Sequence, residues 1–363
     1  MMDPIGVAIV GLGWMGRVHT QAYLRVRQHY PALPTPELVA VADDVPGRSA
    51  AAADRFGFAA ATTDWRTLLD DPRIGAVSIT APNFLHREIG AAFAATGRHL
   101  WIEKPVGLSA ADARAIRGTG HVTVGFNYRH APAVQKARAL LRSGGIGAVT
   151  HARFQFLSDY AAAPESALTW RFLRRYGGNG VLGDLGAHAV DLVRHLLGEV
   201  GEVVAADTAT FIPRRPTPSG ATTGHEPGTG PLREVENEDW FAALLRVGEA
   251  RVVVEASRVA AGEQNNYGFA IHGTKGVLSW DFRRMSELLV DGRPVFAGPG
   301  DGEYTAFQPG PGIAMSYDDL KVIEAALFLR SIAGGTPHGP LLSDAIRAAE
   351  ILEAVEAKVI DPE

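Results

Sequence analysis

The chain has 363 residues, of which 46% are hydrophobic and 21% charged, and its net charge at pH 7 is −5. This length predicts two domains, and the ordinary composition predicts a globular protein. The small net charge gives no reason to expect nucleic acid or an anionic membrane as a partner. No stretch approaches the roughly twenty apolar residues of a membrane span. The absence of cysteine excludes a disulfide framework and fits a reducing compartment, so we expect a cytoplasmic protein.

The first apolar run, Ile5–Val10, is predicted to be a buried strand, and a glycine-rich turn and a helical stretch follow it. This order is typical of dinucleotide binding. The glycines allow a tight turn and let the backbone approach a pyrophosphate, which the helix N-terminus then holds. The residues predicted to bind the dinucleotide here are Gly11, Gly13, Trp14, Met15 and Gly16.

The second predicted strand, residues 37–42, ends at Asp43 and Asp44. An acid at this place hydrogen-bonds the adenosine ribose and repels a 2′-phosphate, so Asp43 favours NAD over NADP. Two alternatives stay open. The aspartates could begin a turn or cap the next helix, and Arg48 could accommodate a phosphate.

Two further strand ends bring polar residues to the same predicted sheet edge. Residues 76–80 form a strand that leads into Thr80, Pro82 and Asn83, and a helix follows with His86 near its start. A histidine at such a place is more often a packing or capping residue than a catalytic one. The next strand ends at Glu103-Lys104-Pro105, which places Lys104 just past its carboxyl end, where open α/β sheets bind ligands. The alternative for Lys104 is an exposed loop lysine paired with a neighbour.

In the second half of the chain, segments in which polar and apolar residues mostly alternate predict the strands of a sheet. The strands are expected near 147–157, 203–211, 240–247, 250–259, 269–273, 276–282 and 287–290. A Pro-, Gly- and Thr-rich loop is expected over 213–233, as the most mobile part of the chain, and closing helices over 318–333 and 343–357. Apolar spacing predicts one helix over 181–197, with Asp184 and His188 on one face. Such a pair could form an acid/base pair, a structural hydrogen bond or part of a metal site. No cluster supplies further metal ligands, so we expect no metal.

Four motifs in order, G-L-G-W-M-G, A-P-N-x-x-H, E-K-P and G-F-N-Y-R, resemble the Gfo/Idh/MocA oxidoreductases. The resemblance implies an α/β fold: an N-terminal Rossmann domain with a doubly wound parallel sheet, and a C-terminal α/β domain with a large, mostly antiparallel sheet. It implies that Lys104 is catalytic, often with a cis bond to Pro105, and that the matching D-x-x-x-H supplies Asp184 and His188. One departure is a short helix between 105 and 122, which we interpret as a trimmed surface element.

The resemblance also extends the predicted site. Trp170 and Arg171 match a pair that lies beside the cofactor in sugar-oxidising branches, and their alternative roles are a core aromatic and a surface ion pair. The cofactor-binding set further includes Thr80, Pro82, Asn83, His86, Glu103 and Lys104. The predicted substrate residues are Lys104, Asn127, Tyr128, Arg129, Tyr160, Asp184 and His188, with Asn265 and Asn266 as further polar residues near the nicotinamide.

These residues predict hydride transfer between NAD and a secondary alcohol of a sugar, sugar derivative or cyclitol, as in the branch that includes levoglucosan and inositol dehydrogenases. His188 would take the hydroxyl proton, Asp184 would orient His188 or bind a hydroxyl, and Lys104 would stabilise the alkoxide. The expected domains are residues 1–125 for NAD and 126–363 for substrate and self-association as a dimer or tetramer through the sheet. The alternatives are a redox-neutral glycoside-modifying enzyme with bound NAD and a non-catalytic NAD-binding regulator.

Overall fold

A computed structural model describes residues 3–218, 220 and 226–360. Contacts divide it into two units. The first unit comprises Met1–Asn127 and Ser316–Ile346, and the second comprises Tyr128–Met315 and Arg347–Glu363. The domain boundary expected after residue 125 remains a prediction. The helix near residue 320, which was expected in the second domain, belongs to the first unit.

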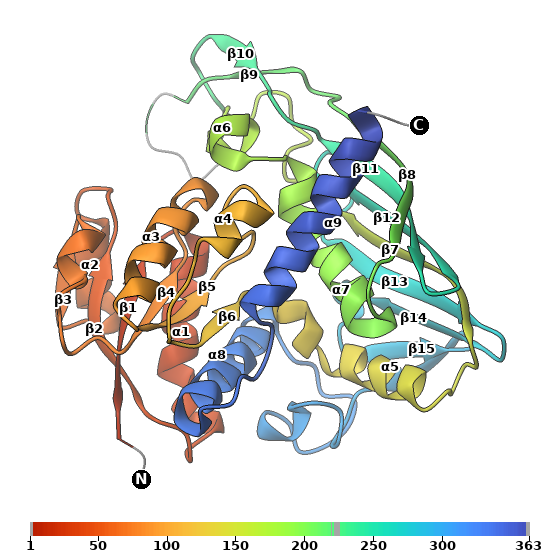
Figure 1. The fold of residues 1–363 in the computed structure, drawn as a ribbon, viewed down its shortest axis with the longest axis horizontal. Helices are drawn as coiled ribbons and strands as arrows, with labels where there is room; N and C mark the ends of the chain where they lie inside the picture. Colours follow the sequence, from red (N-terminus) through yellow and green to blue (C-terminus); the bar gives the residue numbers. More distant parts are fainter. Residues whose placement is uncertain (1–2, 219, 221–225, 361–363) are drawn as a thin grey trace. The chain divides into compact units, whose positions relative to one another are not determined.

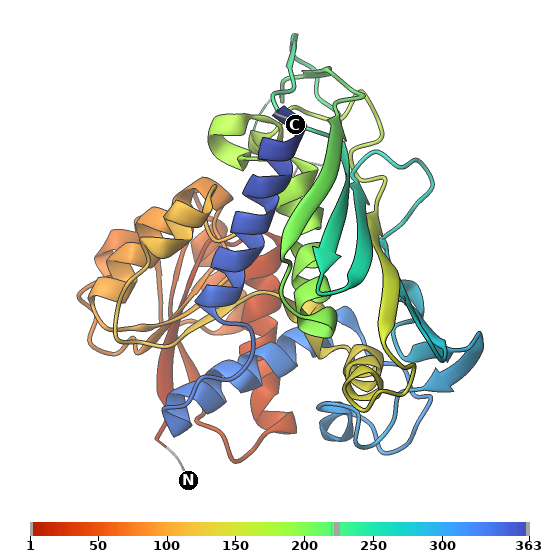
Figure 2. The ribbon, with the colours of Figure 1, turned by 45° about the vertical axis from the view of Figure 1, so that its right-hand side comes forward.

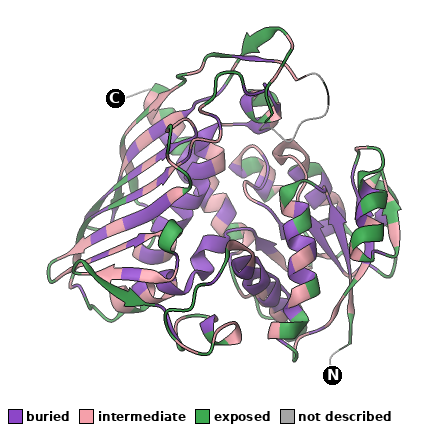
Figure 3. Ribbon diagram, turned by 180° about the vertical axis from the view of Figure 1, so that it is seen from behind, coloured by how far each residue is buried: buried purple, intermediate pink, exposed green. Residues whose placement is uncertain are grey.

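The first unit is built on a six-stranded, fully parallel sheet in the order β3-β2-β1-β4-β5-β6 (Figure 1). This order is that of a Rossmann fold, and its ligand crevice lies at the carboxyl ends of the strands. Its central strands are continuous apolar runs because helices cover both faces of a parallel sheet, and Figure 3 shows them buried. The strands are β1 (Ile5–Val10), β2 (Pro36–Ala42), β3 (Ala60–Thr62), β4 (Ala76–Ile79), β5 (His99–Ile102) and β6 (Val122–Val124).

The helices of the first unit alternate with its strands, except for one that returns from the far end of the chain. They are α1 (Trp14–His29), α2 (Arg48–Phe56), α3 (Asn83–Ala95), α4 (Ala110–Arg114) and α8 (Tyr317–Gly334), and α9 (Leu342–Ile360) begins here. Helix α8 starts with a capping box in which Ser316 and Asp319 satisfy each other's main-chain N–H groups, and it packs along α1. A short segment before α9 also pairs with β6, since Val124 N–H donates to Pro340 O at 3.0 Å. Helix α8 and the start of α9 therefore belong to the first unit.

The second unit contains an eight-stranded sheet in the order β16-β15-β14-β13-β7-β12-β11-β8. All neighbours are antiparallel except β7 and β12, which confirms the mostly antiparallel prediction. Figure 2 views this sheet nearly edge-on, with α7 along one of its faces. The strands are β7 (Val149–Leu157), β8 (Glu202–Ala209), β11 (Trp240–Val247), β12 (Ala250–Ser257), β13 (Asn266–Gly273), β14 (Val277–Asp281), β15 (Glu287–Val290) and β16 (Arg293–Phe296).

Several elements of the second unit differ from the predictions. Helix α5 (Pro132–Arg142) was not predicted, and α6 (Arg174–Gly177) is a single turn. The helix expected over 181–197 is a π-helical turn, Leu182–Gly186, followed by α7 (Ala187–Leu197). The loop expected over 213–233 contains the paired strands β9 (Arg214–Pro216) and β10 (Leu232–Glu234), while residues 219 and 221–225 of that loop lie outside the described part. Short 3-10 turns lie at Trp65–Leu68, Asn127–His130, Trp170–Phe172, Phe282–Arg284 and Tyr304–Ala306. In the described part of the chain, no helix has the length and apolar character needed to cross a membrane.

Candidate active site

The glycine-rich turn has the geometry that a pyrophosphate needs. Gly11 has a positive φ of 94°, and a Cβ on it would lie 2.6 Å from Ala81 N, so only glycine fits there. A Cβ on Gly13 would meet nothing within 4 Å, which leaves open space beside the N-terminus of α1. Gly13 gives that helix no side-chain cap, and its first turn carries no acid. The turn thus fits the anionic part of a dinucleotide.

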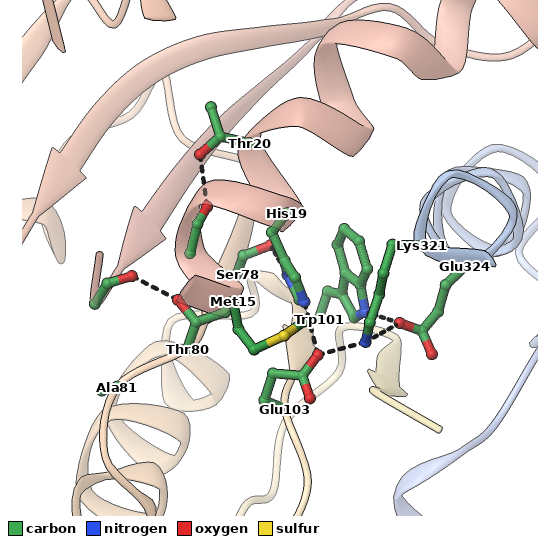
Figure 4. A network of polar contacts seen from close by, with 12 residues as sticks. Met15, His19, Thr20, Ser78, Thr80, Ala81, Trp101, Glu103, Lys321 and Glu324 are labelled. Carbon is green, nitrogen blue, oxygen red and sulfur yellow. Dashed lines mark hydrogen bonds and ion pairs between the residues drawn. The ribbon is translucent and has the colours of Figure 1, made fainter. Parts of the chain in front are cut away.

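Two threonines hold the carbonyl oxygens of this turn. Thr80 Oγ1 donates to Gly11 O at 2.6 Å, and Thr20 Oγ1 donates to Gly16 O at 2.7 Å (Figure 4). Thr80 is therefore a support for the turn. Pro82 caps α3 and Asn83 is its first residue, so both lie at the same strand-end edge, as predicted from the parallel order.

Asp43 follows β2 and reaches the glycine-rich turn. Its carboxylate accepts a hydrogen bond from Leu12 N–H at 2.6 Å and one from Val45 N–H at 3.0 Å, and it pairs with Arg48 at 3.2 Å. Arg48 is thus directed to Asp43, which weakens the alternative of a phosphate-binding arginine. A carboxylate offers about four lone-pair positions, so ribose hydroxyls can still be bound.

The main chain around Lys104 is held from both sides. Glu103, directly before it, is buried, and its carboxylate accepts hydrogen bonds from His19 Nε2 at 2.8 Å and from Lys321 Nζ. Pro105, directly after it, has its carbonyl oxygen 2.8 Å from His86 Nδ1, and His86 Nε2 lies 2.7 Å from Ala81 O. The Lys104–Pro105 bond is cis, which confirms the expectation from the family. His86 is 1% exposed and burial lowers its pKa, so its ring ties two loops together as a structural group.

Behind Lys104, four ionisable side chains form a buried cluster, which we call the Glu103 cluster (Figure 4). Its members are His19, Glu103, Lys321 and Glu324. Lys321 Nζ donates to both carboxylates, at 2.8 Å to Glu324, and Glu324 also accepts from the Trp101 indole at 3.0 Å. Burial opposes the charge of Lys321, but the two carboxylates outweigh it and raise the Lys321 pKa.

The other members of the Glu103 cluster have shifted pKa values for the same reasons. Burial lowers the pKa of His19 to about 4 and raises that of Glu324 to about 7, against the attraction of Lys321. Burial alone would raise the pKa of Glu103, but Lys321 and His19 lower it well below its usual range. The imidazole and the two carboxylates form the one set of metal-type ligands in the described part of the chain, and the Lys321 ammonium already bridges the carboxylates.

Asn127 and Tyr317 complete the first unit's part of the site. Tyr317, the first residue of α8, stacks on Trp14 with ring centroids 5.3 Å apart, and its hydroxyl donates to Met15 Sδ at 3.6 Å. Trp14 is 60% exposed although it is aromatic. Asn127 is fully buried, and its amide lies against the Tyr317 side chain without a hydrogen bond of good geometry. Buried amides are nearly always paired, so Asn127 fits a residue that awaits a ligand.

In the second unit, Asp184 lies in the π-helical turn and not in an α-helix. Such turns are rare and are frequent at functional sites. The Tyr160 hydroxyl donates to Asp184 Oδ2 at 2.8 Å. Burial and the neighbouring Asp184 raise the pKa of Tyr160 well above its usual range, so Tyr160 stays a donor. The predicted substrate residue Tyr160 is therefore first of all a partner of Asp184.

The start of the π-helical turn is capped by Glu238, which lies shortly before β11. Glu238 accepts Leu182 N–H on its carboxylate at 2.9 Å and Val181 N–H on its carbonyl oxygen at 3.1 Å. Asp239 pairs with Arg258 at 2.8 Å, and both side chains are at most 1% exposed. The Arg258 guanidinium also donates to Asn237. The turn that carries Asp184 is thus attached to a rigid, buried ion pair.

His188 lies at the start of α7 inside an aromatic cage. Its ring centroid is 4.8 Å from that of Tyr128, in an edge-to-face arrangement, and Tyr267 OH donates to His188 O at 2.8 Å. One turn further, Asp191 forms a buried bidentate pair with Arg129, whose Nε lies 2.7 Å from Asp191 Oδ2. Arg129 is thus an anchor of α7, and its predicted contact with substrate remains a prediction.

The remaining predicted residues occupy different places. Trp170 and Arg171 form a cation–π contact at 4.4 Å in a 3-10 turn. Asn265 precedes β13, and Asn266 accepts from Gln155 at 3.0 Å. Neighbouring strand residues point to opposite faces, so Asn266 faces away from the side on which Tyr267 meets His188. The expectation that Asn265 and Asn266 lie near the nicotinamide remains a prediction.

The structure gathers the dinucleotide residues, Lys104 and Asn127 in the first unit, and Tyr160, Asp184, Tyr128 and His188 in the second. The convergence of Lys104 with Asp184 and His188 remains a prediction. Sequence reasoning missed Tyr317, Lys321 and Glu324 of α8 and Glu238 as a cap. One signal was available: a lysine and a glutamate three residues apart interrupt an otherwise apolar helical run over 320–329.

Comparisons with known proteins agree with this geometry. Residues 5–123 match the oxidoreductase family with an NAD-binding Rossmann fold, and residues 134–279 match the GFO/IDH/MocA C-terminal domain. Levoglucosan dehydrogenase of Pseudarthrobacter phenanthrenivorans is 36% identical over 98% of this chain and 96% of its own. Inositol 2-dehydrogenase of Rhizobium meliloti is 25% identical over 97% and 96%.

A solved levoglucosan dehydrogenase in complex with NADH and L-sorbose has a TM-score of 0.92 and 33% identity, over 99% of this chain and 97% of its own. Similarity of this extent covers both units and all the motifs described above. The chain therefore belongs to the Gfo/Idh/MocA family of oxidoreductases, with an NAD-binding Rossmann fold.

Proposed function

We propose that this protein is an NAD-dependent dehydrogenase of a secondary alcohol on a sugar, an anhydrosugar or a cyclitol. The observation that carries the proposal is the 36% identity to a levoglucosan dehydrogenase along nearly the whole of both chains, with Lys104, Asp184 and His188 all present. A solved levoglucosan dehydrogenase bound to NADH and levoglucosan supports this substrate class. NAD, when bound, supplies the hydride acceptor.

The chain's own residues divide the remaining chemistry. His188 takes the hydroxyl proton, and its aromatic cage and the hydrogen bond from Tyr267 to its main chain fix its place. Asp184, held by Tyr160, orients His188 or binds a substrate hydroxyl. The Lys104 ammonium stabilises the developing alkoxide. Preorganised charges of this kind accelerate a reaction because they need no rearrangement as the charge develops.

The dinucleotide residues hold NAD in the first unit. The glycine-rich turn binds the pyrophosphate and Asp43 the adenosine ribose. The buried amide of Asn127 binds a polar group of the nicotinamide half or of the substrate, which would give its nitrogen and oxygen well-aligned partners.

The test measures reduced-nicotinamide absorbance with NAD and NADP over a panel of pyranoses, anhydrosugars and inositols. We expect turnover with NAD, and a loss of at least about a thousandfold in Lys104→Ala. The matched control is Lys275→Ala, which changes a lysine in the hairpin turn before β14 and leaves the rate unchanged. Bound NAD without turnover on any polyol would contradict the proposal and favour the redox-neutral enzyme or the regulator.

We also propose that the protein is cytoplasmic and forms a homotetramer or dimer through the eight-stranded sheet. The support is the sheet face opposite α7, where Leu244, Val253 and Arg153 lie side by side in register, and Val253 is 38% exposed. Light scattering after gel filtration tests this, and Val253→Glu is expected to shift the mass toward the monomer. A monomeric wild type would contradict it.

A further inference from the structure

We propose that Lys321 and Glu324 of α8 are positioning residues for Lys104, and that they act through Glu103. The proposal rests on the proposed function, since it assigns a role to the machinery around Lys104. Both residues lie more than two hundred positions along the chain from Glu103. Figure 4 shows Lys321 in contact with Glu103, and Glu324 in contact with Lys321 and with the Trp101 indole.

The Glu103 cluster costs more free energy than apolar packing in the same place would. Lys321 and Glu324 are 0% exposed and Glu103 is 7% exposed. Removing such charges from water costs much of what their attraction gains, and apolar side chains of similar size often stabilise a protein as well or better. The charged groups orient one another, because each donates or accepts its hydrogen bonds at preferred angles.

The cluster fixes the orientation of the Glu103 carboxylate. His19 Nε2 and Lys321 Nζ both donate to the same oxygen, Oε1, so the carboxylate is held in one position. His19 is itself fixed, because its ring stacks on Trp101 at 3.5 Å and its Nδ1 lies 3.2 Å from Ser78 Oγ. The carboxylate also fills the space over Gly125, where a Cβ would lie 2.5 Å from Oε1.

Glu103 is joined directly to Lys104 in the chain. A buried Glu103 side chain that accepts two hydrogen bonds restricts where the Glu103 main chain lies, and hence where the peptide group that leads to Lys104 begins. Pro105 is tied to His86 on the other side of Lys104. Lys104 is thus the middle residue of a short segment that is held at both ends, and a small displacement of a catalytic group costs a large factor in rate.

The Glu103 cluster also makes the surroundings of Lys104 depend on pH. The ionisable groups that face Glu324 are Lys321 and Tyr317 on its own helix, Glu103 after β5 and His19 on α1. Of these groups, Glu324 changes its charge near neutral pH, and its ionised form competes with Glu103 for Lys321. A merely structural cluster would alter stability with pH but not the surroundings of Lys104.

The experiment compares Glu324→Gln and the double variant Lys321→Met/Glu324→Gln with the wild type. The double variant removes the buried cation and one of the two carboxylates together, so it avoids two unpaired buried acids. The control is Arg25→Gln, which breaks the pair between Arg25 of α1 and Asp319 of α8 without touching Glu103. All proteins are first checked by circular dichroism and by NADH fluorescence binding.

The direct readout is NMR of ¹³C-methylated lysines. The chain has only five lysines and Lys321 is fully buried, so few resonances are expected, and Lys104→Arg assigns the one of interest. We expect the Lys104 resonance to move in both cluster variants, and kcat of the double variant to fall at least tenfold with KM for NAD changed less than twofold. We also expect an inflection of kcat near pH 7 in the wild type that disappears in Glu324→Gln.

An unmoved Lys104 resonance with unchanged kcat in the double variant would overturn the proposal. Equal changes in Arg25→Gln would also overturn it, because general loosening of α8 would then be the cause. If the wild type turns over no polyol, the proposed function fails, but the resonance still decides the positioning role.

Discussion

Asp239→Asn tests the buried Asp239–Arg258 ion pair that lies next to the π-helical turn of Asp184. Asp239 Oδ1 accepts from Arg258 Nε at 2.8 Å, and Oδ2 accepts the N–H groups of Phe211 and Ile212 at 2.9 Å each. Asparagine offers one oxygen and one NH₂ group, so in either orientation a buried donor meets another donor. Breaking a buried ion pair by removing one partner costs about 3–5 kcal/mol.

For a unit of roughly 200 residues, this loss lowers Tm by about 6–20 °C. Thermal unfolding followed by circular dichroism and by tryptophan fluorescence measures the effect, with Trp240 next in the chain as a reporter. The matched control is Glu202→Gln, which breaks the exposed Arg246–Glu202 pair of the same sheet at 3.3 Å. An exposed pair contributes less than about 1 kcal/mol. A Tm of Asp239→Asn within 2 °C of wild type, or an equal loss in the control, would refute the reasoning.

Three further changes test other parts of the structure. Tyr160→Phe removes the hydroxyl that donates to Asp184, and a hydrogen bond to a charged group contributes about 1.5–3 kcal/mol. Steady-state kinetics should therefore show kcat lowered by about 10- to 150-fold. An unchanged kcat would contradict this. Lys321→Ala leaves the His19 imidazole and the Glu103 and Glu324 carboxylates facing one another. Micromolar Zn²⁺ should therefore raise the Tm of this variant and not that of the wild type. An unchanged Tm would show that the three ligands do not converge. Glu324→Gln removes a carboxyl group whose pKa burial raises to about 7. The folded wild type binds the proton of this group more tightly than the unfolded chain does, so Glu324 stabilises the wild type at low pH. This stabilisation is lost between about pH 4.5 and 7. Denaturant titrations over this range should therefore show the variant gaining stability relative to wild type as pH rises, and a constant difference would argue against the shift.

The glycine-rich turn and the Lys104 segment could be predicted because their signals are local. A strand, a glycine pattern and a helix follow one another within 25 residues, and the apolar run before Glu103 identifies β5 without any knowledge of the rest of the chain. The parallel strand order then brings both to one edge.

The parts that were missed depend on contacts between distant residues. Apolar spacing over 181–197 does not separate an α-helix from a π-helical turn, and the Glu238 carboxylate that caps the turn comes from 56 residues further along. Strand β9 lies in a stretch whose Pro and Gly content indicates a loop, but Arg215 is fully buried there and its guanidinium lies 4.4 Å from the Phe172 ring. A lysine usually lies on a helix surface, and although the apolar run around Lys321 signals burial, its partner Glu103 comes from 218 residues earlier and is shown only by the fold.

The return of α8 to the first unit sets the order in which the protein can be completed during synthesis. β1 to β6 leave the ribosome within the first 124 residues, but the ammonium that pairs with Glu103 and the segment that covers β6 come about two hundred residues later. Until then the nascent N-terminal part holds an acid in its interior without the cation and exposes the edge of a parallel sheet. The nucleotide-binding unit is therefore finished after nearly all of the second unit has been made, and an N-terminal fragment that ends at Asn127 is expected to need chaperones or to aggregate.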